Sequence, residues 1–200
     1  TNCSTSSNCS TTNCNLIQGW VNVPNGTNYG DVSDWRTYSG ITPTGGGYPT
    51  GPNGDHTSGN GKYLYAETSS GAGCNNSELH ALSPCIDLQN TSLPYLSLWY
   101  NAYGSSIGEL HIDLLKDGHW IQDITTPIIG NQGPNWKRIT ADLTPYQGGV
   151  VVIRVRGLTG NGYLGDFAFD DFSIQEAPQL TYSGSSSICF PDSVHLIYTG

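Results

Sequence analysis

The sequence predicts an all-β sandwich. Short segments that alternate apolar and polar residues recur through the middle of the chain, and clusters of Gly, Pro, Asn and Asp separate them. No long segment repeats its apolar residues with helical spacing. The composition agrees, because 26 Gly, 11 Pro and 10% aromatic residues suit short strands joined by many turns.

The expected strands follow one another between residues 63 and 174. Leu110, Ile112 and Leu114 alternate with polar neighbours, which is typical of a half-buried strand. Asp117-Gly118 then favours a two-residue type I′ turn, so we expect a hairpin that returns through residues 119–121. The run at 149–156 has the strongest strand character, because it is rich in β-branched residues. Further strands are expected at 63–67, 95–100, 136–139 and 167–174.

The composition also divides the chain into three parts. Residues 1–14 are a Ser/Thr/Asn/Cys-rich lead-in, and we expect the β-sandwich to occupy residues 15–176. Residues 177–200 are expected to form a linker, and residues 188–197 resemble the first strand of a following immunoglobulin-like repeat. Because the chain contains no methionine, we expect it to be a piece of a longer protein.

The charge excludes several kinds of partner. Seven Lys and Arg residues against 16 Asp and Glu residues give a net charge of −9, too few cations for a basic stripe. We therefore expect no nucleic-acid partner and no docking to anionic membranes. No apolar run is long enough to span a bilayer, so we also expect no membrane insertion.

The six cysteines suggest disulfides and an oxidising compartment. None forms a Cys-x-x-Cys pair, and their neighbours are mostly Ser, Thr and Asn. Cys74 and Cys85 flank one expected strand, and we predict that they pair. We also expect two of the cysteines near the N-terminus to pair, and leave open whether the third reaches Cys189 or a partner outside the chain; the three are Cys3, Cys9 and Cys14.

Several short motifs in order along the chain resemble the MAM family. Asp34-Trp35-Arg36 resembles the family's early aromatic-basic stretch, and Arg156-Gly157 its turn into the final strand. The chain departs from the family where Leu16-Ile17-Gln18 replaces the acidic Phe-Glu opening strand. The longest matching strings are GDHTSG at 54–59 running into KYLYAE at 62–67, WYNAYG at 99–104 and GDFAFDDF at 165–172.

This resemblance implies a fold and a function. It implies a jelly-roll β-sandwich of two antiparallel sheets, secreted or at the cell surface, that serves adhesion and recognition without catalysis. The expected partners are a protein or glycan and the neighbouring domains of the same polypeptide.

The acidic residues of these motifs predict a structural calcium site. Calcium prefers roughly six to eight oxygen ligands, and jelly-roll modules commonly hold a cation between their entry and exit segments. The alternative is that these side chains cap turns by accepting hydrogen bonds from nearby backbone N–H groups. The candidate ligands are Asp55, Thr57, Asp170, Asp171 and Asp34.

Aromatic residues suggest a ligand-binding surface. Trp120 follows the expected hairpin turn, and Tyr38 and Tyr48 lie among turn-rich residues, so these three rings are the candidates for partner contact. Their flat apolar faces would also suit sugar rings. A rival interpretation is therefore a carbohydrate-binding module, or an accessory domain attached to an exported polysaccharide-degrading enzyme or protease.

Overall fold

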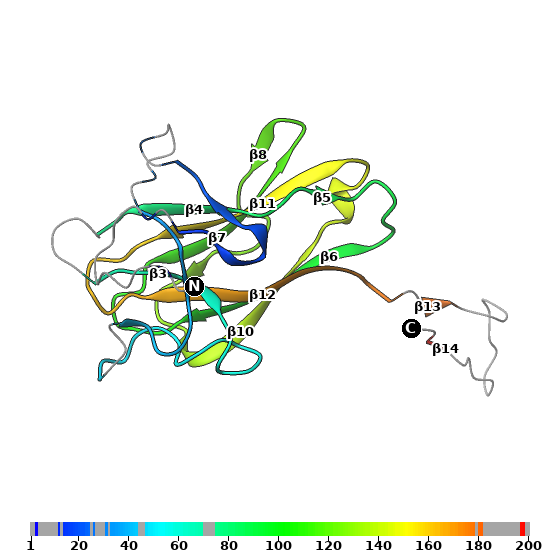
Figure 1. Cartoon of the computed structure of the whole chain (residues 1–200). Coiled ribbons are helices and arrows are strands. Elements are labelled where there is room, and N and C mark those ends of the chain that lie inside the picture. Colours follow the sequence, from blue (N-terminus) through cyan, green and yellow to red (C-terminus); the bar gives the residue numbers. More distant parts are fainter. Residues whose placement is uncertain are drawn as a thin grey trace.

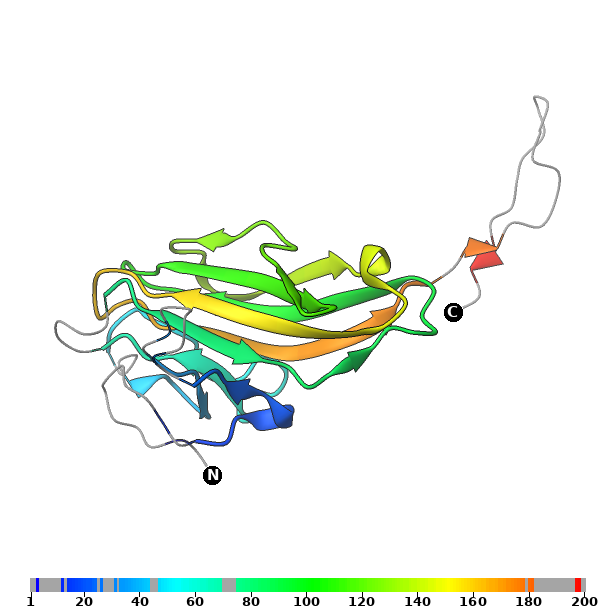
Figure 2. The ribbon, with the colours of Figure 1, turned by 90° about the horizontal axis from the view of Figure 1, so that it is seen from above.

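Two antiparallel sheets pack face to face in the computed structural model, as Figures 1 and 2 show. The structure describes residues 3, 12, 14–24, 26, 31, 33–43, 47–69, 75–178, 180–181 and 197–198. This arrangement confirms the expected all-β sandwich with two antiparallel sheets.

The first sheet has seven strands in the described part of the chain. Its main order is β1 (Val21–Asn22), β4 (Glu78–Leu82), β11 (Val150–Leu158), β7 (Glu109–Lys116) and β8 (His119–Ile121). In addition, β5 (Ile86–Asp87) pairs with β11, and β9 (Ile128–Ile129) pairs with β7.

The second sheet has five strands, and two short hairpin strands lie beyond it. Its order is β10 (Gly133–Asp142), β6 (Pro94–Ala102), β12 (Phe167–Glu176), β3 (Tyr63–Ala66) and β2 (Arg36–Tyr38). The 3-10 helices η1 (Ile17–Gly19) and η4 (Thr144–Tyr146) are one turn each. The separate pair β13 (Leu180–Thr181) and β14 (Ile197–Tyr198) follows β12.

The core lies between the two sheets. Leu110, Ile112 and Leu114 of β7 are buried there, as their alternation predicted. Aromatic rings fill the space under β12, where Trp35 packs edge-on against Phe169 with 4.8 Å between ring centroids. Such edge-to-face pairs add stability beyond the burial of apolar area.

The hairpin between β7 and β8 confirms the predicted turn. Lys116 pairs with His119, so only Asp117 and Gly118 connect the strands. Both residues have positive φ, 50° and 77°, as a type I′ turn requires.

The described cysteines form one disulfide, between Cys3 and Cys14. This confirms that two of the three N-terminal cysteines pair. Cys9 and Cys189 lie outside the described residues, as does most of the expected immunoglobulin-like strand at 188–197.

The predicted Cys74–Cys85 disulfide stays a prediction. Cys74 lies outside the described residues, and Cys85 is an exposed free thiol.

Candidate functional site

A latch joins the loop at residues 53–61 to the second sheet. The ring of His56 stacks on Trp99 of β6, with 3.7 Å between ring centroids. Its backbone N–H donates to Asp170 at 2.9 Å, and its Nδ1 lies 2.7 Å from Asp171 Oδ2. The hydroxyl of Thr57 donates to the same Asp171 oxygen at 2.5 Å. We call this cluster of His56, Thr57, Asp170 and Asp171 the loop latch.

The backbone of β12 is irregular where it meets the latch. Its register with β6 shifts between Asp170 and Ser173, and Asp171 has a φ of 47°. A bulge of this kind places one extra residue in the strand and turns its side chain in a new direction. Both consecutive aspartates therefore reach the same loop, although side chains of a regular strand alternate between its faces.

Asp55 stabilises the turn in which it lies. Its carboxylate accepts hydrogen bonds from the backbone N–H groups of Ser58 and Gly61 and from the Ser58 hydroxyl. Although its slight burial acts in the opposite direction, these hydrogen bonds lower the pKa of Asp55. This is the turn-capping alternative that the sequence left open.

The predicted calcium ligands accept hydrogen bonds from groups within the protein. Asp55, Asp170 and Asp171 direct carboxylate oxygens at N–H and O–H donors, and Asp34 accepts from the backbone N–H of Thr12 instead. Within the described ranges, no three acidic, His or Cys side chains converge closely enough to hold a metal ion by themselves. The structure therefore brings four of the five candidate ligands together but gives their oxygens other partners.

Another aspartate in the described part of the chain, Asp31, is buried without the hydrogen bonds that a buried carboxylate normally accepts. Asp31 is completely buried, and neither of its carboxylate oxygens has a hydrogen-bond partner among the described residues. The backbone N–H groups of Ser33 and His80 act to lower the pKa of Asp31, although neither is in hydrogen-bond geometry with its carboxylate. Burial, followed by the charges of Asp34 and Glu78, raises the pKa of Asp31 to about 7.

The three candidate aromatic residues make separate contacts. Trp120 is partly exposed and covers the guanidinium of Arg154 at 4.0 Å. Tyr48 is exposed and meets Tyr163, whereas Tyr38 packs on Tyr65. Each of the three rings therefore contacts a different residue.

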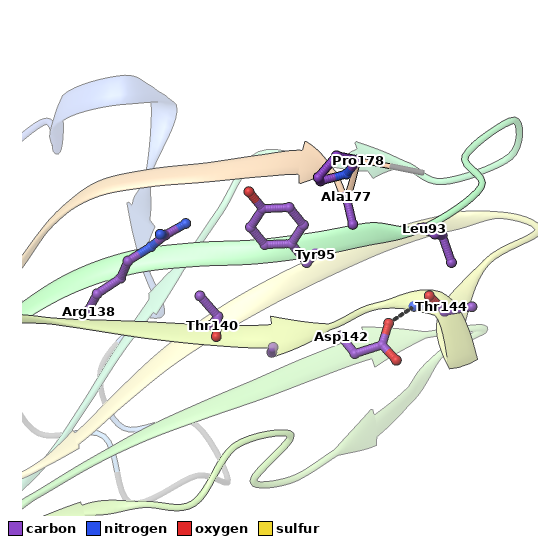
Figure 3. Close-up of a pocket in the computed structure, with 9 residues that line it drawn as sticks. Leu93, Tyr95, Arg138, Thr140, Asp142, Thr144, Ala177 and Pro178 are labelled. Carbon is purple, nitrogen blue, oxygen red and sulfur yellow. Dashed lines mark hydrogen bonds between the residues drawn. The ribbon is translucent and has the colours of Figure 1, made fainter. Parts of the chain in front are cut away.

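An opening lies on the outer face of the second sheet (Figure 3). Arg138, Thr140 and Asp142 line it from β10, and Tyr95 faces them from β6. Leu93, Thr144, Ala177 and Pro178 line the end where β12 leaves the sandwich. We call this opening the exit groove; its volume is 590 Å³.

The exit groove combines apolar and polar surface. Arg138 donates to Ser97 at 2.8 Å, and Asp142 accepts from the backbone N–H of Thr144 at 2.8 Å, so both charged side chains are held in place. Hydrogen bonds from Thr144 lower the pKa of the exposed Asp142 carboxyl. Sequence reasoning missed this groove because its residues come together only through the pairing of β6, β10 and β12.

A buried ion cluster crosses the outer face of the first sheet. Asp113 is fully buried and accepts hydrogen bonds from Arg154 at 2.8 Å and Arg156 at 2.9 Å. Burial acts to raise the pKa of Asp113, but the hydrogen bonds from Arg156, Asp123 and Arg154 lower it overall. The face of β7 that we predicted to be partly exposed is therefore covered by these ion pairs. We call Asp113, Arg154 and Arg156 the Asp113 cluster.

Comparisons with known proteins agree with the fold. The described architecture defines a jelly-roll β-sandwich module, and a family model described as MAM domain, meprin/A5/mu, matches residues 20–178. The chain belongs to the MAM family. MAM domains are extracellular adhesion modules, which agrees with the function that the sequence motifs implied.

Two curated relatives support this assignment. Neuropilin-1a of Danio rerio is 31% identical over 164 residues, which cover 78% of this chain and 17% of the relative. The MAM domain-containing glycosylphosphatidylinositol anchor protein 2 of Homo sapiens is 32% identical over 157 residues, which cover 73% of this chain and 16% of the relative. The chain therefore spans only a small part of the length of each.

Solved structures share the fold at low sequence identity. A cleaved adhesin domain of Lys-gingipain from Porphyromonas gingivalis has a TM-score of 0.51 and 14% identity, covering 79% of this chain and 90% of that one. A cyclase from Fischerella sp. TAU has a TM-score of 0.50 and 14% identity, covering 84% of this chain and 86% of that one. No helix in the described ranges is long and apolar enough to cross a membrane.

Proposed function

We propose that this chain is a non-catalytic recognition module of a larger secreted or cell-surface protein, and that it binds a protein or glycan through the exit groove. The observation that carries the proposal is the groove itself, whose lining includes an aromatic ring, a guanidinium and a carboxylate spaced along it beside apolar surface. Membership of an extracellular adhesion family supports the general role.

The chemistry of the groove suits selective binding. Ligand sites are typically concave and largely apolar, with a few polar groups that fix the orientation of the ligand. Leu93 and Pro178 supply apolar surface, while Arg138 and Asp142 supply a donor and an acceptor of hydrogen bonds. This set can pair with the hydroxyls of a glycan or with the backbone of a peptide.

The position of the groove also suits a module in a longer chain. It lies beside Ala177 and Pro178, directly after the last strand of the sandwich. A partner bound there would lie close to whatever follows β12. This geometry would allow a neighbouring domain to add contacts to the same partner, which raises affinity by increasing effective concentration.

Surface binding with matched variants tests the proposal. The purified chain, displayed on beads, is presented to a glycan array and to a panel of cultured cell surfaces. We expect Arg138→Ala and Tyr95→Ala to reduce binding about tenfold or more each, as for buried aromatic and Arg contacts at an interface. Lys137→Ala, next along β10, and Tyr48→Ala are the controls and should bind normally. If the control variants lost binding while Arg138→Ala and Tyr95→Ala kept it, the proposal that the groove binds the partner would be refuted.

A further inference from the structure

Another, smaller opening lies between the loop at residues 53–61 and the start of β10. We call it the loop pocket; its volume is 270 Å³. It shares no lining residue with the exit groove. The loop contributes Asn53, Gly54, Asp55 and Gly59 to its lining, and β10 contributes Pro134, Asn135 and Trp136.

An irregularity in β10 builds one wall of the loop pocket. The register between β10 and β6 shifts between Gly133 and Lys137, so the three residues between them leave the regular pairing. Such bulges bend a strand and redirect its side chains, and they are frequent next to active sites. Nδ2 of Asn101 on β6 donates to the carbonyl of Pro134 at 2.8 Å, which holds this wall in place.

The opposite wall is a loop that is closed and anchored. A Cβ atom added to Gly54 would clash with the carbonyl oxygen of Gly59, so the two ends of this turn are in contact. The indole Nε1 of Trp136 donates to the carbonyl of Gly54 at 3.2 Å, and the loop latch holds the same loop to β12. The pocket is therefore formed before a ligand binds, which lowers the free-energy cost of binding.

The groups that line the loop pocket suit a sugar ring. The side-chain amides of Asn53 and Asn135 are exposed and make no hydrogen bond within the described part of the chain, although each can both donate and accept. Asp55 adds carboxylate oxygens as acceptors, and the partly exposed indole of Trp136 adds flat apolar surface. A sugar ring offers the matching combination, because its hydroxyls surround an apolar face of C–H groups.

Size and charge narrow the ligand further. The volume lies below the range of roughly 300–1,000 Å³ that is typical of sites for drug-sized ligands, so the pocket suits one ring rather than a peptide. Among the described residues of the lining, only Asp55 is charged, and the chain carries a net charge of −9. Both charges disfavour an anionic ligand.

From this geometry we infer that the loop pocket binds a single neutral pyranose ring, as found at the end of a glycan chain. Asn53 and Asn135 hydrogen-bond its hydroxyls, Asp55 accepts from a further hydroxyl, and Trp136 packs on its C–H face. This inference goes beyond the proposed function, because it adds a binding site that is separate from the exit groove.

A chemical-shift titration of the whole chain tests the inference. The probes are the methyl glycosides of glucose, galactose, mannose and N-acetylglucosamine, with sialic acid as the anionic comparison. We expect at least one neutral glycoside to shift the amides of residues 53–55 and the indole N–H of Trp136 saturably, with a Kd of about 1–10 mM for so small a ligand. Sialic acid should cause no such shift.

Matched variants make the test specific to the loop pocket. Asn53→Ala and Asn135→Ala should each raise the Kd about fivefold, because each removes hydrogen bonds to the ligand. Both side chains are exposed, so circular dichroism should show that the variants remain folded. Asn90→Ala, an exposed amide in the turn before β6, is the control and should bind like the unmodified chain.

The titration also has outcomes that would overturn the inference. It fails if no neutral glycoside causes a saturable shift at about 50 mM, well above the expected Kd. Equal affinities of Asn135→Ala and Asn90→Ala, or a preference for sialic acid, would likewise contradict it. Shifts confined to residues 138–144 would place the sugar in the exit groove instead.

Discussion

At the residue scale, the buried acids determine how this module responds to its solvent. Asp166 is completely buried beside the like charge of Glu67. Its Oδ1 accepts hydrogen bonds from the backbone N–H and hydroxyl of Thr68, while its Oδ2 has no hydrogen-bond partner within the described part of the chain. Burial, followed by the charge of Glu67, raises the pKa of Asp166 to about 7.

This shift predicts a pH dependence with a definite sign. Because the pKa is raised in the folded state, Asp166 favours folding most below its unfolded value of 3.8, and this contribution decreases as pH rises toward 7. Asp166→Asn keeps an acceptor for Thr68 and removes the ionisation. We therefore expect the Tm of the variant, relative to the unmodified chain, to improve steadily between pH 5 and pH 8, measured by circular dichroism in EDTA. If the Tm values of the variant and of the unmodified chain changed in parallel over this pH range, the raised pKa of Asp166 would be contradicted.

At the element scale, strand pairing brings together charges that lie far apart in the sequence. β7 and β11 place Asp113 directly opposite Arg154, and Arg156 reaches the same carboxylate. The alternation of both strands is visible in the sequence, but their register is not. The residues of the Asp113 cluster therefore looked like ordinary solvent-facing positions.

The Asp113 cluster predicts a large loss of stability on truncation. Asp113→Ala leaves two largely buried guanidinium groups without their main partner, and breaking a buried pair in this way typically costs about 3–5 kcal/mol. Asp87→Ala is the control, because Asp87 is exposed and accepts a hydrogen bond from the backbone N–H of Gln89. The control should lose about 1 kcal/mol or less in urea unfolding. Similar losses of unfolding free energy in the two variants would show that the Asp113 cluster contributes little to stability.

The loop latch predicts a local effect. His56→Ala removes the stacking on Trp99 and the contact with Asp171, so the loop at residues 53–61 should open more often. We expect proteolytic cleavage within this loop to accelerate several-fold while β6 and β12 remain protected. His119→Ala, at the exposed start of β8, should be cut at the normal rate. Unchanged cleavage of the His56 variant would rule out the latch as the restraint.

At the scale of the whole molecule, the alternation of apolar residues and the family motifs predicted the two-sheet fold better than they predicted the candidate binding surface. Strand alternation located the β7–β8 hairpin and the buried face of β7, because periodicity depends only on neighbours in sequence. The exit groove depends on how β6, β10 and β12 align, which no local pattern reveals. Two residues of the DHT motif at 55–57, His56 and Thr57, contact Asp170 and Asp171, while the calcium expected at these residues stays a prediction.

The most direct test of the central claim is a hydrogen-exchange footprint of the chain bound to the partner that it captures. If the exit groove binds that partner, amides at residues 93–96 and 138–144 should exchange more slowly in the complex. The outer face of the first sheet, around Trp120 and Asp123, should exchange as in the free chain. Protection confined to that face, with the groove unchanged, would contradict the account.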